Sequence, residues 1–164
     1  MASITLWRPM TEQDSQTDWK DIYIREVRVN YVASDKPRMK VNGPVDIADF
    51  VRSILIDNSR EQFVALYFDG SHCVVSYSII TIGIANQSLV HPREVFQRAI
   101  LIGATAVVVA HNHPSGSLVP SQEDIAVTNR LKEAGTLLGI QLLDHVIVSD
   151  FAFTSLREDN RCWP

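Results

Sequence analysis

The 164-residue sequence is not strongly basic, contains little cysteine and has no long apolar run. It carries 15 Lys and Arg residues against 19 Asp and Glu residues, a net charge of −4, so electrostatic attraction to nucleic acid is not expected. Its apolar stretches are too short to cross a bilayer, and residues 1–10 show no signal peptide. The two cysteines, Cys73 and Cys162, lie far apart without a CxxC pair, which favours reduced thiols in a cytoplasmic protein.

The composition that remains is typical of a globular domain. Apolar residues make up 46% of the chain and charged residues 21%, and the length suffices for one hydrophobic core. Residues 1–20 are polar and weakly patterned, so we expect a flexible N-terminal arm. Residues 21–164 are expected to form a single domain.

Apolar periodicity predicts four elements in the first half of this domain. Residues 21–33 are strand-like with a change of phase, and residues 34–43 are interpreted as a solvated loop, with basic contact to an acidic partner as a lesser alternative. A helix follows, with an apolar face formed by Ile47, Phe50, Val51, Ile54 and Leu55. The runs 63–68 and 73–80, separated by Asp-Gly-Ser-His, indicate a β-hairpin.

The second half alternates between helices and strands. His91-Pro92 opens a helix with a buried stripe of Val95, Ala99 and Ile102, and Gly103 ends it. A buried strand over 106–110 leads to a helix that starts after Ser121, and a last strand covers 142–148. The expected core face of that helix is Val127, Leu131, Ala134 and Leu138, with Gly139 as its end. The order β-α-β-β-α-β-α-β predicts an α/β fold with a mixed sheet.

The most informative segment is His111-Asn112-His113-Pro114-Ser115-Gly116, followed by Ser121 and Asp124. Side chains alternate along an extended strand, so both histidines project to the same side of the strand end. Together with Asp124 they offer three ligands for one Zn²⁺ ion and leave a fourth position for water, the pattern of a catalytic zinc site.

Simpler explanations exist for each part of this segment. A His-x-His pair alone is weak, since histidines often serve as hydrogen-bonding residues in loops. Ser121 and Asp124 have the spacing of a helix N-cap and its third helical residue. Both roles of Asp124 can coexist, because the Pro-Ser-Gly turn and Pro120 bring the helix start back toward the strand end.

His-x-His-Pro followed by Ser-x-x-Asp resembles the JAMM motif of the JAB/MPN metalloprotease superfamily. The string His-Asn-His-Pro-Ser-Gly with Pro-Ser-x-x-Asp resembles the RadC-like branch, and the similarity extends over about residues 41–156. It implies a JAB/MPN-like, cytidine-deaminase-like curved mixed sheet flanked by helices. Longer RadC-like members carry an N-terminal helix-hairpin-helix segment, for which we expect no room here.

A zinc-bound water also needs a general base, and two glutamates compete for this role. Glu94 lies at a helix start, where the helix dipole alone explains a carboxylate. Glu61 precedes the strand after the first helix, the position of the motif glutamate in JAB/MPN proteins, so the resemblance favours Glu61. Ser121 could additionally donate to the oxyanion of the substrate.

The remaining polar residues near the motif receive lesser roles. Asn112 is expected to point away from the metal, and Asp144-His145 to orient a ligand or pack a strand. His72 and His91 are interpreted as loop or cap residues.

The resulting hypothesis is a JAMM-type zinc metallopeptidase that hydrolyses peptide or isopeptide bonds. It would bind one Zn²⁺ per chain through His111, His113 and Asp124, with Glu61 and Ser121 as catalytic residues. Expected partners are a peptide or protein substrate, with neither strong DNA binding nor a membrane, and no oligomeric state is indicated. The alternative is a module of DNA repair or mobile elements that acts on or near DNA, with a structural or vestigial zinc.

Overall fold

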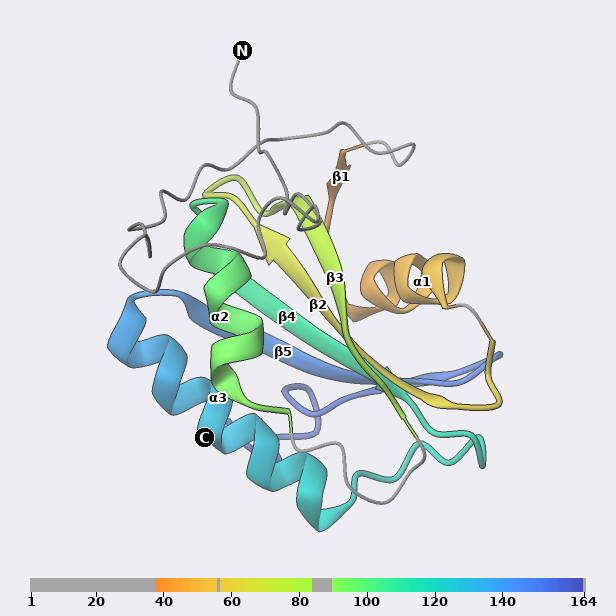
Figure 1. The fold of residues 1–164 in the computed structure, drawn as a ribbon. Helices are drawn as coiled ribbons and strands as arrows, with labels where there is room; N and C mark the ends of the chain where they lie inside the picture. Colours follow the sequence, from red (N-terminus) through yellow and green to blue (C-terminus); the bar gives the residue numbers. More distant parts are fainter. Residues whose placement is uncertain (1–37, 56, 84–89, 164) are drawn as a thin grey trace, which may run out of the picture. The chain divides into compact units, whose positions relative to one another are not determined.

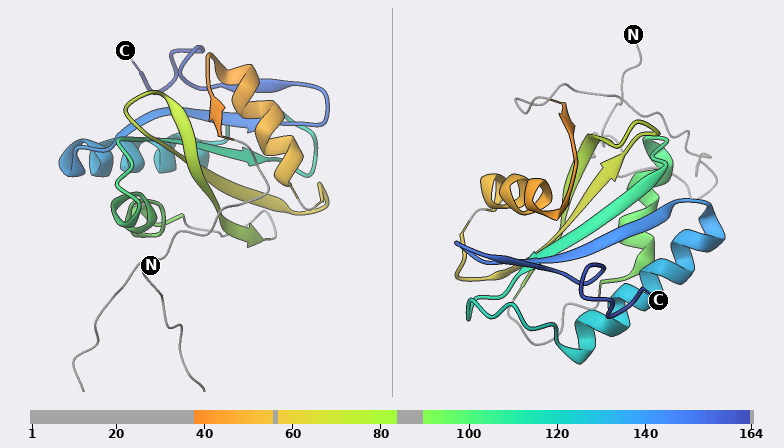
Figure 2. Two further views of the ribbon diagram at one scale, coloured as in Figure 1. Left: turned by 90° about the horizontal axis from the view of Figure 1, so that it is seen from above. Right: turned by 180° about the vertical axis from the view of Figure 1, so that it is seen from behind.

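A six-stranded mixed sheet forms the centre of the computed structural model, which describes residues 38–55, 57–83 and 90–163 (Figure 1). The strand order is β1-β3-β2-β4-β5-β6, where only β4 and β5 pair in parallel among the described strands. The strands are β1 (Met39–Lys40), β2 (Glu61–Phe68), β3 (Cys73–Gly83), β4 (Ala106–Asn112), β5 (Gln141–Val148) and β6 (Phe153–Ser155). The predicted mixed α/β sheet is confirmed, and Figure 2 shows its curvature from two further directions.

Helices cover both faces of the sheet. The helices are α1 (Pro44–Ile54), α2 (Pro92–Leu101) and α3 (Gln122–Leu138). On one face, alternate residues of β2 and β4 pack with α2 and α3 in a cluster that includes Phe63, Val109 and Leu131. On the other face, the intervening strand residues pack with α1. Because both faces are covered, β2 and β4 are buried along nearly their whole length, as their continuous apolar runs predict.

The local signals for the helices and the hairpin are confirmed. Asp69 closes the β2–β3 turn by accepting hydrogen bonds from the backbone N–H groups of Ser71 and Cys73. His91 caps α2 by accepting from the backbone N–H of Arg93. The C-cap of α3 is Gly139, whose φ of 69° is a left-handed conformation that glycine adopts without strain.

Several sequence-based expectations were incomplete or wrong. Part of the loop expected over 34–43 forms β1, which pairs with the start of β3, and β6 was not predicted. Leu138, at the last position of α3, is 45% exposed, and Leu55 is the C-cap of α1 rather than a helical residue. The expected arm over 1–20 and strand over 21–33 lie outside the described residues.

Candidate metal centre

The two histidines of the motif meet at the carboxyl end of β4. His111 is fully buried opposite Phe63 of β2, and the two rings are nearly parallel with centroids 6.0 Å apart. His113 lies just beyond the strand, and its Nε2 is 2.9 Å from Nε2 of His111. The extended backbone therefore brings both imidazoles to one side, as strand alternation predicts.

Asp124 reaches the same point from the first turn of α3. Its Oδ1 is 3.2 Å from Nε2 of His111 and its Oδ2 is 3.5 Å from Nε2 of His113. One ligand atom from each of the three residues lies within 4.8 Å of the other two. The structure thus brings together the three predicted ligands from a strand end, a turn and a helix start.

A capping box holds Asp124 in this position. The Ser121 hydroxyl accepts from the backbone N–H of Asp124 at 3.1 Å, and Asp124 Oδ2 accepts from the backbone N–H of Ser121 at 2.7 Å. The Ser121 hydroxyl also donates to Asp124 Oδ2 at 2.7 Å. The predicted N-cap is confirmed, and the same contacts aim the carboxylate at the histidines.

The electrostatics of the cluster favour a carboxylate anion. Burial alone raises the pKa of Asp124, but hydrogen bonds with His111 and His113 outweigh it and hold this pKa well below its usual range. The hydrogen bond with Asp124 raises the pKa of His113, although burial opposes it, and the negative charge of Glu61 adds a smaller increase. The cluster therefore has a net affinity for positive charge.

The donor chemistry of the cluster suits a metal cation. His113 Nδ1 is 2.9 Å from the carbonyl oxygen of Ser117, which can only accept, so Nδ1 carries the proton. A cation that replaced the Nε2 proton bonded to Asp124 would therefore meet the Nε2 lone pair of a neutral His113. Two imidazole nitrogens and a carboxylate in this arrangement match the ligand set of three-ligand zinc sites. The residues present fit a bound divalent metal.

Asn112, between the two histidines, connects the cluster to the start of β2. It is buried, and its side chain accepts from the backbone N–H of Gln62 at 2.8 Å and donates to the carbonyl of Arg60 at 3.0 Å. These two bonds flank Glu61 on both sides. Glu61 lies two residues before Phe63 and His113 two residues after His111, so continuing the β2–β4 register sets Glu61 opposite His113.

Asp144 and His145 lie on opposite faces of β5. A register irregularity between Val107 and Val108 precedes them, after which Val108 pairs with Asp144 and Val109 with His145. His145 is fully buried against His111, with 2.8 Å between His145 Nε2 and His111 Nδ1. Sequence reasoning treated Asp144-His145 as one unit, but alternation along the strand separates them.

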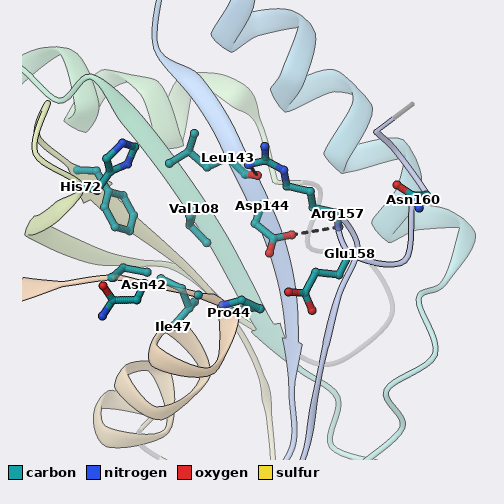
Figure 3. Close-up of a pocket in the computed structure, with 13 residues that line it drawn as sticks. Asn42, Pro44, Ile47, His72, Val108, Leu143, Asp144, Arg157, Glu158 and Asn160 are labelled. Atoms are coloured by element: carbon teal, nitrogen blue, oxygen red, sulfur yellow. Dashed lines mark hydrogen bonds between the residues drawn. The ribbon is translucent and has the colours of Figure 1, made fainter.

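Asp144 instead lines a cavity of about 450 Å³ on the α1 face, shown in Figure 3 beside Arg157 and Glu158. Its carboxylate accepts from the Ser155 hydroxyl at 2.7 Å and from the backbone N–H of Arg157 at 3.1 Å. Burial raises the pKa of Asp144, although these hydrogen bonds oppose the increase. Asp144 therefore has no part in the metal cluster.

Together, the fold and the cluster define an α/β domain with a candidate metal centre of two histidines and one aspartate at the end of a buried central strand. The chain belongs to the RadC-like JAB domain family, which it matches over residues 41–161. The resemblance inferred from the motif is thus confirmed.

Curated relatives of the chain are named UPF0758 proteins. A UPF0758 protein of Staphylococcus aureus (strain bovine RF122) is 46% identical over 125 residues, which cover 76% of this chain and 55% of that protein. A UPF0758 protein of Staphylococcus carnosus (strain TM300) is 42% identical over 128 residues, covering 78% of this chain and 57% of that protein. The chain thus spans somewhat more than half the length of these relatives.

Helix length and polarity also bear on the membrane prediction. Among the residues that the structure describes, no helix is both long and apolar enough to cross a bilayer. This agrees with the short apolar runs of the sequence.

Proposed function

We propose that this chain is a zinc-dependent hydrolase of peptide or isopeptide bonds. The observation that carries the proposal is the convergence of His111, His113 and Asp124, whose ligand atoms lie within 4.8 Å of one another. Three protein ligands leave one coordination position for water or substrate, as in catalytic zinc sites. A zinc ion bound there would lower the pKa of a coordinated water to about 7 and polarise a substrate carbonyl.

Glu61 is the general base in this proposal. Its carboxylate accepts a proton from the attacking water and delivers it to the departing amine. Support comes from the Asn112 side chain, which binds the backbone on both sides of Glu61. Further support is the β2–β4 register, which when continued by two residues sets Glu61 opposite His113.

Glu94 is the weaker candidate for the base. Its side chain is 44% exposed in the first turn of α2 and lies 3.6 Å from the guanidinium of Arg93. A carboxylate at this position interacts favourably with the helix dipole and needs no catalytic explanation.

Ser121 has a second role in this proposal. Its hydroxyl oxygen can keep accepting from the backbone N–H of Asp124 while its proton turns from the carboxylate toward the substrate oxyanion. A single donor of this kind is worth roughly 100- to 1000-fold in turnover.

A carbonyl substrate suits the cluster better than a phosphodiester. In the part of the chain that the structure describes, these three residues form the only group of three or more potential metal ligands. Two-metal phosphodiesterases hold a second ion through additional ligands, which stabilises the leaving alkoxide.

The test combines peptide-library and nuclease assays on one preparation of the zinc-loaded protein, with product analysis by mass spectrometry. Glu61→Gln should retain fold and zinc but lose at least about 100-fold in peptide turnover. Glu94→Gln is the matched control and should retain most activity. A reversed ranking of the two variants would transfer the base role to Glu94. Nuclease activity that disappears in Glu61→Gln, without peptide cleavage, would overturn the proposal.

A further inference from the structure

A line of buried hydrogen bonds runs from the metal cluster into α3. His111 Nδ1 contacts His145 Nε2 at 2.8 Å, and His145 Nδ1 contacts the Thr128 hydroxyl at 2.6 Å. Thr128 Oγ1 in turn lies 2.6 Å from the backbone carbonyl of Asp124, the residue that also supplies the carboxylate. Thr128, His111 and His145 are all fully buried. The line begins and ends at residues of the metal cluster.

The hydrogen-bond partners determine the position of each proton along this line, beginning at the backbone carbonyl of Asp124. The carbonyl oxygen of Asp124 can only accept, so the single hydroxyl proton of Thr128 points to it. The Thr128 oxygen must then accept from His145, which places the His145 proton on Nδ1. His145 is fully buried and its ring nitrogens contact His111 and the Thr128 hydroxyl rather than a carboxylate, so a charged imidazolium would be buried without a counter-charge, and the ring is neutral with one N–H.

The remaining contact then determines the tautomer of His111. A neutral His145 with its proton on Nδ1 has a lone pair on Nε2 and accepts from His111 Nδ1. His111 therefore carries a proton on Nδ1, so its Nε2, which faces Asp124 and His113, is the nitrogen whose lone pair is free for a metal once the cation replaces the hydrogen bond to Asp124. This is the tautomer that a metal ligand requires at Nε2.

We infer that Thr128 and His145 are positioning residues that hold His111 in its metal-binding tautomer. Phe63 supports the same geometry, since its ring stacks on His111 and meets His145 edge-on with centroids 5.4 Å apart. A partial rotation of the His111 ring would therefore lose its near-parallel stacking on Phe63. The inference rests on the metal-binding half of the proposed function and does not depend on the reaction catalysed.

Thr128 offers a matched pair of variants. In Thr128→Val the shape is nearly retained but the acceptor for His145 Nδ1 is lost. The His145 tautomer with its proton on Nε2 is then favoured, because that N–H can donate to His111 Nδ1. His111 Nδ1 must accept this hydrogen bond, so the His111 proton moves to the metal-binding Nε2. Thr128→Ser keeps the hydroxyl and so keeps the tautomers. Outer hydrogen-bond partners of metal-ligating histidines are typically worth about 10- to 100-fold in metal affinity.

Two measurements on the full chain test the inference. First, the long-range couplings between ¹⁵N and ring ¹H nuclei in metal-stripped protein report which nitrogen of each histidine is protonated. We expect Nδ1–H on His111 and His145 in the unmodified protein and in Thr128→Ser. Second, competition with a chromophoric chelator gives the zinc affinity, which should fall at least tenfold in Thr128→Val and less than about threefold in Thr128→Ser.

The two measurements separate the possible failures. An Nε2–H form of His145 in the unmodified protein would overturn the inference, whatever the metal affinity. Equal zinc affinity in folded Thr128→Val and Thr128→Ser would also overturn it. If the unmodified protein bound no zinc, the proposed function would fail, whereas the couplings would still decide the tautomers.

Discussion

Replacement of Ser121 by alanine tests whether one hydroxyl both caps α3 and serves the proposed chemistry. The Ser121 oxygen accepts from the backbone N–H of Asp124 at 3.1 Å and donates to the Asp124 carboxylate at 2.7 Å. The second arm of the capping box, from the Ser121 backbone N–H to the same carboxylate, survives the substitution.

The expected magnitude follows from the two lost contacts. Loss of a serine N-cap costs about 1 kcal/mol in the free energy of unfolding. Loss of a partly exposed hydrogen bond to a carboxylate costs about 1 kcal/mol more. The sum of about 2 kcal/mol corresponds to a decrease in Tm of roughly 4 to 8 °C for a chain of this size.

Ser121→Gly is the matched control, because glycine at an N-cap costs only a few tenths of a kcal/mol relative to serine. Thermal unfolding of EDTA-treated protein should therefore rank Ser121→Ala about 2 °C below Ser121→Gly. In the zinc-loaded protein both variants should lose roughly 100- to 1000-fold in turnover, since both lack the oxyanion donor. Equal Tm values in the two variants would refute the capping argument. Unchanged turnover would refute the oxyanion role.

Three further predictions concern the metal, the pH and nucleic acid. Elemental analysis of protein purified without added metal should give about one zinc per chain, and His113→Ala should lose most of it; full retention would exclude His113 as a ligand. Because burial raises the pKa of Asp144 above its usual 3.8, the folded protein binds this proton more tightly than the unfolded chain does. The free energy of unfolding, relative to that of Asp144→Asn, should therefore decrease as the pH rises above about 4, as measured by urea titration; a constant difference would contradict it. With a net charge of −4, the chain should bind labelled duplex DNA only weakly at physiological salt, and sub-micromolar affinity would favour a role on DNA.

Much of the candidate site could be predicted because its signals are local. Strand alternation is sufficient to bring His111 and His113 to one side, and the spacing of Ser121 and Asp124 identifies a helix start. The same holds for the hairpin turn at Asp69, whose side chain bonds residues only a few positions away. Such patterns involve neighbours along the chain, so they can be read without knowing the register of the sheet.

Contacts between distant segments could not be predicted in this way. Two-residue β1 is too short to show periodicity and exists through its pairing with β3. The spacing of Leu138 fits the apolar face of α3, but its 45% exposure depends on which neighbours the tertiary packing places beside the last turn of the helix. Alternation puts Asp144 and His145 on opposite faces of β5, but only the pairing of β5 with β4 determines that His145 is the one that contacts His111.

The sequence by itself determined the three metal-binding candidates, the capping of α3 and the alternation of helices and strands, because each depends on short-range geometry. Only the tertiary structure decided that the Asn112 side chain bonds the backbone on both sides of Glu61. It also decided that His145 contacts His111 and that Thr128 contacts His145. These contacts join residues 17 to 52 positions apart, which the chain brings together only when β2, β4, β5 and α3 pack in one register. The physical reason is that a hydrogen bond constrains distance and direction in space, whereas sequence periodicity constrains only neighbours within a few residues.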